Sequence, residues 1–263
     1  MNLENWQIRK GAKCELARRH FYDFCQVMAP DFYKPDREYL KTICDETEDF
    51  ITSDDDILII NAPPRHGKSR TGTLLSDWIF GKDQSKKIMI GSYNETLSET
   101  FSKDVRNRID TQTLDPRVIV YKDIFPDVRI KKGDGAVTRW SLEGQHASYL
   151  STSPTGTATG FGADYLIIDD LIKSALEANN ANVLQGHWDW FTNTMLSRLE
   201  EGGKIIVIMT RWHTQDLSGR ILKEYANKKI RHITMAAETD GKMLCDEILS
   251  YETYLDKTRL MGA

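Results

Sequence analysis

Residues 57–69 read Ile-Leu-Ile-Ile-Asn-Ala-Pro-Pro-Arg-His-Gly-Lys-Ser, and this stretch decides the fold. Its first four residues are aliphatic, which predicts a short strand that is buried on both faces of a sheet. A helical pattern of apolar residues follows from Thr71 to Phe80. A strand, a turn with Gly-Lys-Ser and a helix, in this order, form the context of a phosphate-binding loop. We therefore expect the backbone N–H groups of this turn and the helix N-terminus to bind a polyphosphate.

The residues of this loop have distinct expected roles. Lys68 would reach the β- and γ-phosphates, and the Ser69 hydroxyl would ligate Mg²⁺. Ala62 stands where the pattern Gly-x4-Gly-Lys-Ser begins with glycine, and alanine fits there if no positive φ is required. The residues expected to contact the nucleotide are Ala62, Pro63, Pro64, Arg65, His66, Gly67, Lys68, Ser69 and Arg70. The alternative is a Gly-Lys-Ser helix start that binds no ligand.

An acidic pair follows a second apolar run. Asp169 and Asp170 come directly after Tyr165–Ile168. The carboxyl ends of parallel strands form the edge of a sheet where ligands bind. We expect Asp169 to hold Mg²⁺ through water, and Asp170 to orient or deprotonate an attacking water. The alternative is an ordinary solvated strand end.

The wider pattern alternates strands with helices. Central strands are predicted at 57–60, 88–90, 165–168 and 205–209, with 230–235 as a weaker candidate, and helical stripes at 97–109, 188–199 and 217–225. This alternation predicts an α/β fold with a mostly parallel central sheet and helices on both faces. The run Ile88–Ile90 lies between the two nucleotide motifs along the chain. An extra strand between two nucleotide strands, with a second acid after the Mg²⁺ acid, is typical of the additional-strand (ASCE) P-loop NTPases, which include helicases, recombinases and packaging motors.

The segments outside these strands complete the predicted organisation. One apolar stripe from Cys14 to Met28 predicts a helix, and a second stripe from Tyr39 to Ile51 predicts another. Residues 1–53 would therefore form a helical segment that packs on the core and on the adenine side, and residues 54–263 would form the ATPase core. Residues 115–162 are rich in Gly, Ser, Thr and Pro and predict loops with a β-excursion. Ser174 and Glu177 have the spacing of a capping box, which predicts a helix start.

The strand at 205–209 ends in a third polar motif, Thr210-Arg-Trp-His213. A polar residue at the tip of the neighbouring strand can sense the γ-phosphate and pass its loss to another segment, which is the role expected for Thr210. Arg211 could pair with a phosphate or a carboxylate. The alternative is that Thr210 caps a helix within 214–226 and that Trp212 packs.

Three motifs in this order resemble the large terminase subunit of tailed bacteriophages. They are Pro-Pro-Arg-His-Gly-Lys-Ser at 63–69, Ile-Asp-Asp-Leu-Ile-Lys at 168–173 and Thr-Arg-Trp-His-x-x-Asp-Leu-x-Gly-Arg at 210–220. The resemblance extends over roughly residues 30–254. It implies an ATPase motor that hydrolyses Mg-ATP to move double-stranded viral DNA into a procapsid.

The resemblance also implies roles for individual residues. Lys68, Asp170, Arg65 and Thr210 would be the catalytic residues, with Arg65 contacting phosphate or switching between hydrolytic states. Asp169 would be the Mg²⁺ acid together with Ser69. Many members have Glu where Asp170 stands, so the acid is shorter here. Glu177 is the rival for the role of the base, although its capping-box position indicates a structural role.

Two features depart from the family pattern. The Gly-rich approach Thr159-Gly-Phe-Gly162 lacks the arginine that several relatives offer to the adjacent subunit. Arg139, Arg198 and Arg211 are the candidates for this role, although Arg198 could simply be a charge at a helix end. Full terminase subunits continue into an RNase H-like nuclease, so we expect this chain to lack the C-terminal nuclease domain and not to cleave DNA.

The resemblance implies partners and a location. They are double-stranded DNA bound without sequence preference, the portal protein, the small terminase subunit and further copies of the chain. The copies would form a ring, a pentamer, when assembled on the procapsid, and the chain would be a monomer in solution. The location is the cytoplasm of the infected bacterial host. Basic clusters that could contact DNA phosphates lie at 9–10, 18–19, 86–87, 103–108 and 129–132. The rings of Phe32-Tyr33-Lys34-Pro35 and of Tyr39 could contact the adenine, with Tyr33 as the nucleotide-binding candidate, and ordinary packing is the alternative.

Composition restricts the classes of protein that this chain can represent. Its 263 residues are 40% hydrophobic and 28% charged with a net charge of −4, values close to those of ordinary globular proteins. The apolar runs are far shorter than the roughly 20 residues of a membrane span, so no membrane partner is expected. The four cysteines lack CxxC spacing, which argues against a zinc site. A helicase-like ATPase that remodels DNA, and a module that binds nucleotide for assembly without turnover, are the remaining alternatives.

Overall fold

A seven-stranded sheet organises the chain. The computed structural model describes residues 3–134, 136–156, 158, 160–225 and 227–261. The strand order is β3-β4-β2-β5-β6-β1-β7. All neighbouring strands are parallel except the β3–β4 pair at one edge, so the predicted mostly parallel sheet is confirmed. The strands are β1 (Ile57–Asn61), β2 (Ile88–Ser92), β3 (Arg139–Trp140), β4 (Tyr149–Thr152), β5 (Ala163–Asp169), β6 (Leu199–Met209) and β7 (Ile230–Thr234).

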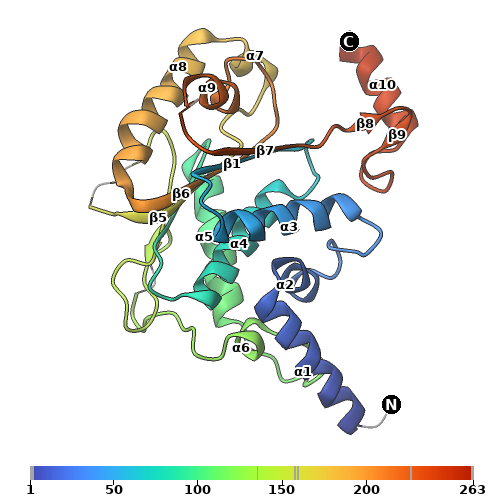
Figure 1. The fold of residues 1–263 in the computed structure, drawn as a ribbon, viewed down its shortest axis with the longest axis vertical. Coiled ribbons are helices and arrows are strands. Elements are labelled where there is room, and N and C mark those ends of the chain that lie inside the picture. The colour runs from blue at the N-terminus through green and yellow to red at the C-terminus, as the bar shows by residue number, and fades with distance from the viewer. Residues whose placement is uncertain (1–2, 135, 157, 159, 226, 262–263) are drawn as a thin grey trace.

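Helices cover both faces of the sheet (Figure 1). One face carries α1 (Leu3–Arg19), α2 (Phe21–Met28), α3 (Glu38–Thr52), α4 (Lys68–Lys82), α5 (Glu95–Asp110) and α6 (Tyr121–Ile124). The other face carries α7 (Ala175–Ala178), α8 (Ala181–Trp190) and α9 (Leu217–Glu224), and α8 continues through a π turn at Phe191–Met195 and a 3-10 turn at Leu196–Arg198. Successive side chains of a strand point to opposite faces. Leu58 and Ile60 of β1 therefore lie in the first core, and Ile57 and Ile59 in the second.

The position of β6 corrects the expectation about the inserted strand. In the sheet, β6 lies between β1 and β5, whereas β2, which follows β1 along the chain, lies on the far side of β5. The sequence order of the strands does not reveal this, because each parallel connection can cross to either side of the strand it leaves. The additional strand between the two nucleotide strands is therefore residues 199–209 and not the run Ile88–Ile90.

The N-terminal stripe is broken into two helices, so the prediction of one helix over 14–28 is wrong. His20 has an extended backbone (φ −120°, ψ 131°) between α1 and α2. The backbone N–H of Phe21 donates to Glu48 Oε2 of α3 at 2.7 Å, which replaces a bond that an unbroken helix would make internally. Both helices still bury apolar residues in the core that they share with α4, and the Phe21 and Trp78 rings lie 5.6 Å apart.

The region 115–162 contains the predicted excursion. β4 extends the sheet beyond β2, and β3 pairs with it antiparallel. At the other end of the chain, β8 (Glu238–Thr239), β9 (Lys242–Met243) and α10 (Tyr251–Met261) lie to one side of the sheet (Figure 1). We call residues 236–261 the C-terminal arm. No helix in the described ranges combines the length and the hydropathy that crossing a bilayer requires.

Candidate functional site

The turn between β1 and α4 has the backbone of a loop that wraps an anion. Gly67 caps α4 with φ +88°, and Arg65 also has a positive φ of 67°. A Cβ atom at position 67 would overlap Cε1 of Phe32, so glycine is required there for two reasons. Ala62 does not have a positive φ, and this meets the condition under which alanine can replace the usual glycine.

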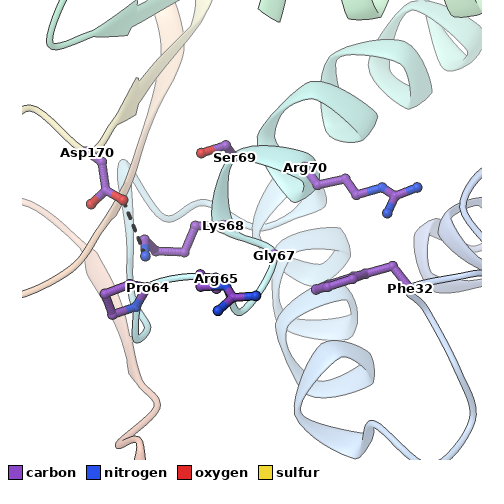
Figure 2. A pocket seen from close by; sticks show the side chains of 8 residues that line it. All are labelled: Phe32, Pro64, Arg65, Gly67, Lys68, Ser69, Arg70 and Asp170. Carbon is purple, nitrogen blue, oxygen red and sulfur yellow. Dashed lines mark ion pairs between the residues drawn. The ribbon is translucent and has the colours of Figure 1, made fainter. Parts of the chain in front are cut away.

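A pocket of about 340 Å³ opens in front of this loop (Figure 2). Its lining consists of Phe32, Pro64, Arg65, Gly67, Lys68, Ser69, Arg70 and Asp170. The structure thus brings six residues of the predicted loop together with the predicted catalytic acid. Ala62, Pro63 and His66 do not line it. The His66 ring is buried, and its Nδ1 lies 2.9 Å from the carbonyl oxygen of Pro64, so it supports the loop from behind.

Lys68 lies at the base of the pocket. Its Nζ donates to the carbonyl oxygen of Pro63 at 3.0 Å and lies 3.3 Å from Asp170 Oδ2. Figure 2 shows this ion pair across the pocket. The side chain is buried, so its charge is poorly screened by solvent. A buried ammonium at the base of a pocket is suited to phosphate oxygens.

Asp169 ends β5 beside Ser69. The Ser69 hydroxyl donates to Asp169 Oδ2 at 2.7 Å. The other carboxylate oxygen, Oδ1, is buried and has no hydrogen-bond partner among the described residues. Burial, and then the negative charge of Asp170, raise the pKa of Asp169 to about 7.

This arrangement fits a divalent cation. A hydroxyl oxygen and a carboxylate with a free buried oxygen are the hard ligands that Mg²⁺ prefers. The described residues contain no cluster of three or more His, Cys, Asp or Glu side chains that could hold a metal alone. Mg²⁺ commonly binds through one or two protein ligands plus substrate phosphates and water, so Ser69 and Asp169 would suffice.

Asp170 joins the ends of β5 and β6. Its backbone N–H donates to the carbonyl oxygen of Ile208, and its Oδ1 accepts the backbone N–H of Thr210 at 2.6 Å. Asp170 has φ +33°, a strained conformation for a residue with a side chain. In this conformation the Asp170 carboxylate lies beside Lys68 at the end of the strand.

Thr210 contacts both nucleotide strands. Besides its amide contact with Asp170, its hydroxyl donates to the carbonyl oxygen of Ala62 at 3.3 Å. The alternative interpretation of this segment is wrong, because α9 is capped by Asp216, whose Oδ1 accepts the N–H of Gly219. Trp212 does not pack inside the molecule and is 40% exposed.

A family comparison agrees with this geometry. Residues 59–260 match the model of a family described as terminase large subunit, T4likevirus-type, N-terminal. The chain belongs to this terminase family. No curated protein sequence matches it.

Solved phage structures resemble the chain at low identity. The HK97 bacteriophage large terminase is 15% identical with a TM-score of 0.51, and the match covers 87% of this chain and 46% of that one. The large terminase of a thermophilic bacteriophage in complex with ATP-γ-S is 13% identical with a TM-score of 0.45, and the match covers 79% of this chain and 44% of that one. The N-terminal domain of the bacteriophage phi29 DNA packaging ATPase is 14% identical with a TM-score of 0.42, and the match covers 73% of this chain and 96% of that one. The chain therefore spans about half the length of the HK97 large terminase, with which it shares the additional-strand P-loop fold predicted from the sequence.

The three arginines considered for a role at the adjacent subunit, Arg139, Arg198 and Arg211, are not among the described residues that line the pocket. Arg211 Nε donates to buried Asp216 Oδ2 at 3.0 Å, so its charge is already paired. Arg198 lies in the 3-10 turn after α8, and its Nε is buried without a hydrogen-bond partner among the described residues. Arg139 is exposed at the start of β3, where its Nη2 lies 3.4 Å from the carbonyl oxygen of Gly160.

The ring at the terminase pocket is Phe32, and the prediction for Tyr33 is wrong. Tyr33 is 1% exposed, and its hydroxyl hydrogen-bonds Thr71 Oγ1 at 2.7 Å in the first turn of α4. It therefore anchors the helix and has no free face for a base. Residues 30–36 form turns, so no periodicity in the sequence distinguishes the inward ring from the outward one. The glycine at position 67 leaves room for a ring, but the sequence does not say that the ring is that of Phe32.

Proposed function

We propose that the pocket between β1, β5 and α4 binds Mg-ATP and hydrolyses it to drive the packaging of double-stranded DNA. One observation carries this proposal. The two groups expected to bind the phosphates and the metal ion, Lys68 and Ser69, each lie beside one of the two acids, at 3.3 Å from Asp170 and 2.7 Å from Asp169. These contacts bring together the phosphate-binding lysine, the metal ligands and the water-orienting acid that phosphoryl transfer to water uses.

Different residues at the pocket bind the phosphates, hold the metal ion and activate the attacking water. The N–H groups at the start of α4 and the Lys68 ammonium hold the phosphates. When bound, Mg²⁺ would be held by Ser69 and Asp169 and would neutralise charge on the phosphate oxygens. Asp170 orients the attacking water and accepts its proton while the water oxygen bonds to the γ-phosphorus and the bond to the β–γ bridging oxygen breaks. The N–H of Thr210 holds the Asp170 carboxylate in position for this step.

The open side of the pocket suits a contribution from a neighbouring subunit. Arg65 is exposed at the mouth, where it can stabilise charge on the transferred phosphoryl group. Among the arginines that could act in trans, Arg139 is exposed and has no carboxylate partner among the described residues. Arg211 would first have to leave Asp216. We therefore favour Arg139, on the surface of a ring of identical subunits.

Nucleotide turnover would be passed on through Thr210. This residue contacts Asp170 on one side and Ala62 on the other, so a change in Asp170 after loss of the γ-phosphate alters a bond to β6. The loop that follows reaches the surface at Trp212. The Phe32 ring forms a wall of the pocket on which a purine base can pack.

The basic clusters differ in their freedom to contact DNA. Lys86, Lys87, Lys103 and Arg108 pair with carboxylates of the chain. Arg129, Lys131 and Lys132 are exposed and have no carboxylate partner in the part of the chain that the structure describes. They are the residues we favour for contacts with DNA phosphates, bound without sequence preference. The portal protein and the small terminase subunit would be the protein partners, with the ring docked on the procapsid portal in the cytoplasm of the infected bacterium.

Hydrolysis of γ-labelled ATP under single-turnover conditions at high protein concentration tests the proposal. We expect phosphate release that requires Mg²⁺ and increases when copies assemble. Binding without any release would instead favour an assembly module, and strand displacement of a DNA duplex would favour a helicase-like enzyme.

A further inference from the structure

Two arginines, Arg37 and Arg70, lie over the Phe32 ring. The ring packs against Gly67 at the edge of the pocket (Figure 2). The guanidinium carbon of Arg37 lies 4.7 Å from the ring centroid and that of Arg70 lies 5.5 Å away. Guanidinium groups at these distances are attracted to aromatic faces and fix the plane of the ring.

The two arginines depend on different parts of the chain. Arg70 makes a two-bond contact with Asp31, the residue next to Phe32, at 2.8 and 2.9 Å. Arg37 donates from Nη1 to the carbonyl oxygen of Phe32 at 3.1 Å and from Nη2 to Glu247 Oε2 at 2.7 Å. The Arg37 side chain is only 9% exposed, and Glu247 is its one carboxylate partner in the described ranges.

Glu247 belongs to the C-terminal arm, more than two hundred residues from Arg37. The same carboxylate also accepts from Lys34 Nζ at 2.8 Å. Within the described part of the arm, Glu247 makes the only ion pairs that reach the rest of the chain. The arm is therefore tied electrostatically to the segment that forms one wall of the nucleotide pocket.

We infer that Arg37 is a positioning residue for Phe32 at the nucleotide pocket, and that Glu247 of the C-terminal arm holds Arg37 in place. The inference rests on the proposed function, because it assumes that a nucleotide packs on Phe32. By linkage, a nucleotide that depends on this arrangement must also stabilise the docked position of the arm. The arm and the pocket thus influence each other through three side chains.

Nucleotide affinity of point variants in the full chain tests the inference. Titration with a fluorescent, non-hydrolysable ATP analogue should give a Kd raised about twofold to tenfold by Glu247→Gln and by Arg37→Ala. Lys34→Ala is the matched control, since it removes the other partner of Glu247 and leaves the Phe32 ring untouched. Its Kd should equal that of the wild type. Because the phosphate site is unchanged, KM should rise while kcat stays near the wild-type value.

Two further measurements separate positioning from general stability. In a Phe32→Ala background, Glu247→Gln should have no additional effect on Kd, because the two changes act through one ring. Hydrogen exchange in residues 236–250 should slow when the analogue binds to the wild type, and should not slow in Arg37→Ala. Glu247 is exposed, so its variant folds even if the Arg37 variant does not.

The outcomes of these measurements distinguish a failure of the inference about Arg37 and Glu247 from a failure of the proposed nucleotide-binding function. Wild-type affinity for Glu247→Gln, with normal binding by the wild type, would overturn the inference and leave the proposed function intact. An effect of Glu247→Gln that adds fully to that of Phe32→Ala would also overturn it. Failure of the wild type to bind the analogue, or equal binding by Lys68→Ala, would overturn the proposed function and the inference with it.

Discussion

The Ser69 hydroxyl donates to Asp169 Oδ2 at 2.7 Å, although the two residues lie 100 positions apart in the sequence. This contact joins the first turn of α4 to the end of β5 and places a buried carboxylate next to the phosphate loop. Burial of a carboxylate with an unpartnered oxygen costs free energy that packing alone does not return. The cost is understandable if the site serves a cation and a polyphosphate.

The free-energy cost of burying the Asp169 carboxylate should make the stability of the protein depend on pH, and replacing Asp169 should remove this dependence. Its pKa is raised to about 7 by burial and by Asp170, whereas in the unfolded chain it is near 3.8. The native state therefore keeps a proton that the unfolded state releases, and the free energy of unfolding falls as pH rises from about 4 to about 7. We expect Asp169→Asn to be more stable than the wild type by on the order of 1–3 kcal/mol at pH 8, with a smaller difference at pH 5.

Urea unfolding at several pH values, with EDTA present, measures this effect. Asp77 also has a pKa raised by burial, but it is present in both proteins and cancels in the comparison. Asp189→Asn, at an exposed site, is the control and should leave the pH profile unchanged. A difference between wild type and Asp169→Asn that stays constant from pH 5 to pH 8 would contradict the assigned pKa.

Removing the ammonium of Lys68 should abolish turnover. Lys68→Ala deletes the one lysine among the described residues that line the pocket and leaves Asp170 without its ion pair. We expect phosphate release to fall at least about a hundredfold. Lys82→Ala, at the other end of the same helix, is the matched control. Similar rates for both variants would exclude the proposed phosphate site.

Replacing Asp170 should separate binding from chemistry. Asp170→Asn keeps an oxygen that can accept the N–H of Thr210 but removes the charge that accepts a proton. ATP binding should persist while single-turnover hydrolysis slows by about two to four orders of magnitude. Nucleotide binding by filter retention and release of labelled phosphate distinguish the two steps, and undiminished release would assign the base elsewhere.

A methyl group at Gly67 should damage the phosphate loop. Gly67→Ala meets both a left-handed backbone and the Phe32 ring, so it should lower the free energy of unfolding by about 1–2 kcal/mol and weaken nucleotide binding at least about tenfold. Gly11→Ala in α1 is a suitable comparison, since nothing lies within 4 Å of the new methyl group. It should leave nucleotide affinity unchanged. Thermal melts and analogue titration of both variants provide the check, and equal affinities would refute the close approach of Phe32.

The sequence predicted those features that are local in the chain. The phosphate loop is continuous from Asn61 to Ser69, and the acids directly follow Ile168, so each motif carries its own structural context. The four strands predicted at 57–60, 88–90, 165–168 and 205–209 are recognisable because apolar residues run without interruption through a sheet covered on both faces, whereas β7 carries Arg231 and His232 and gives a weaker signal. The run that ends at Met209 places Thr210 at a strand tip for the same reason.

Features that depend on distant contacts were missed. The break at His20 follows from Glu48, which belongs to another helix. The choice of Phe32 over Tyr33 follows from the bond between Tyr33 and Thr71. Arg37 donates a hydrogen bond to Glu247, and no spacing or periodicity in the sequence relates these two positions. The place of β6 in the sheet likewise depends on which way each crossover turns.

The sheet order has a consequence for synthesis on the ribosome. The neighbours of β1 are β6 and β7, which begin at Leu199 and Ile230, so no sheet partner exists while residues 62–198 are being made. A nascent chain of that length exposes Ile57–Ile60 as an unpaired aliphatic edge, the type of segment that aggregates. Fragments released before β6 should therefore depend on chaperones, and fragments that include β7 should escape them.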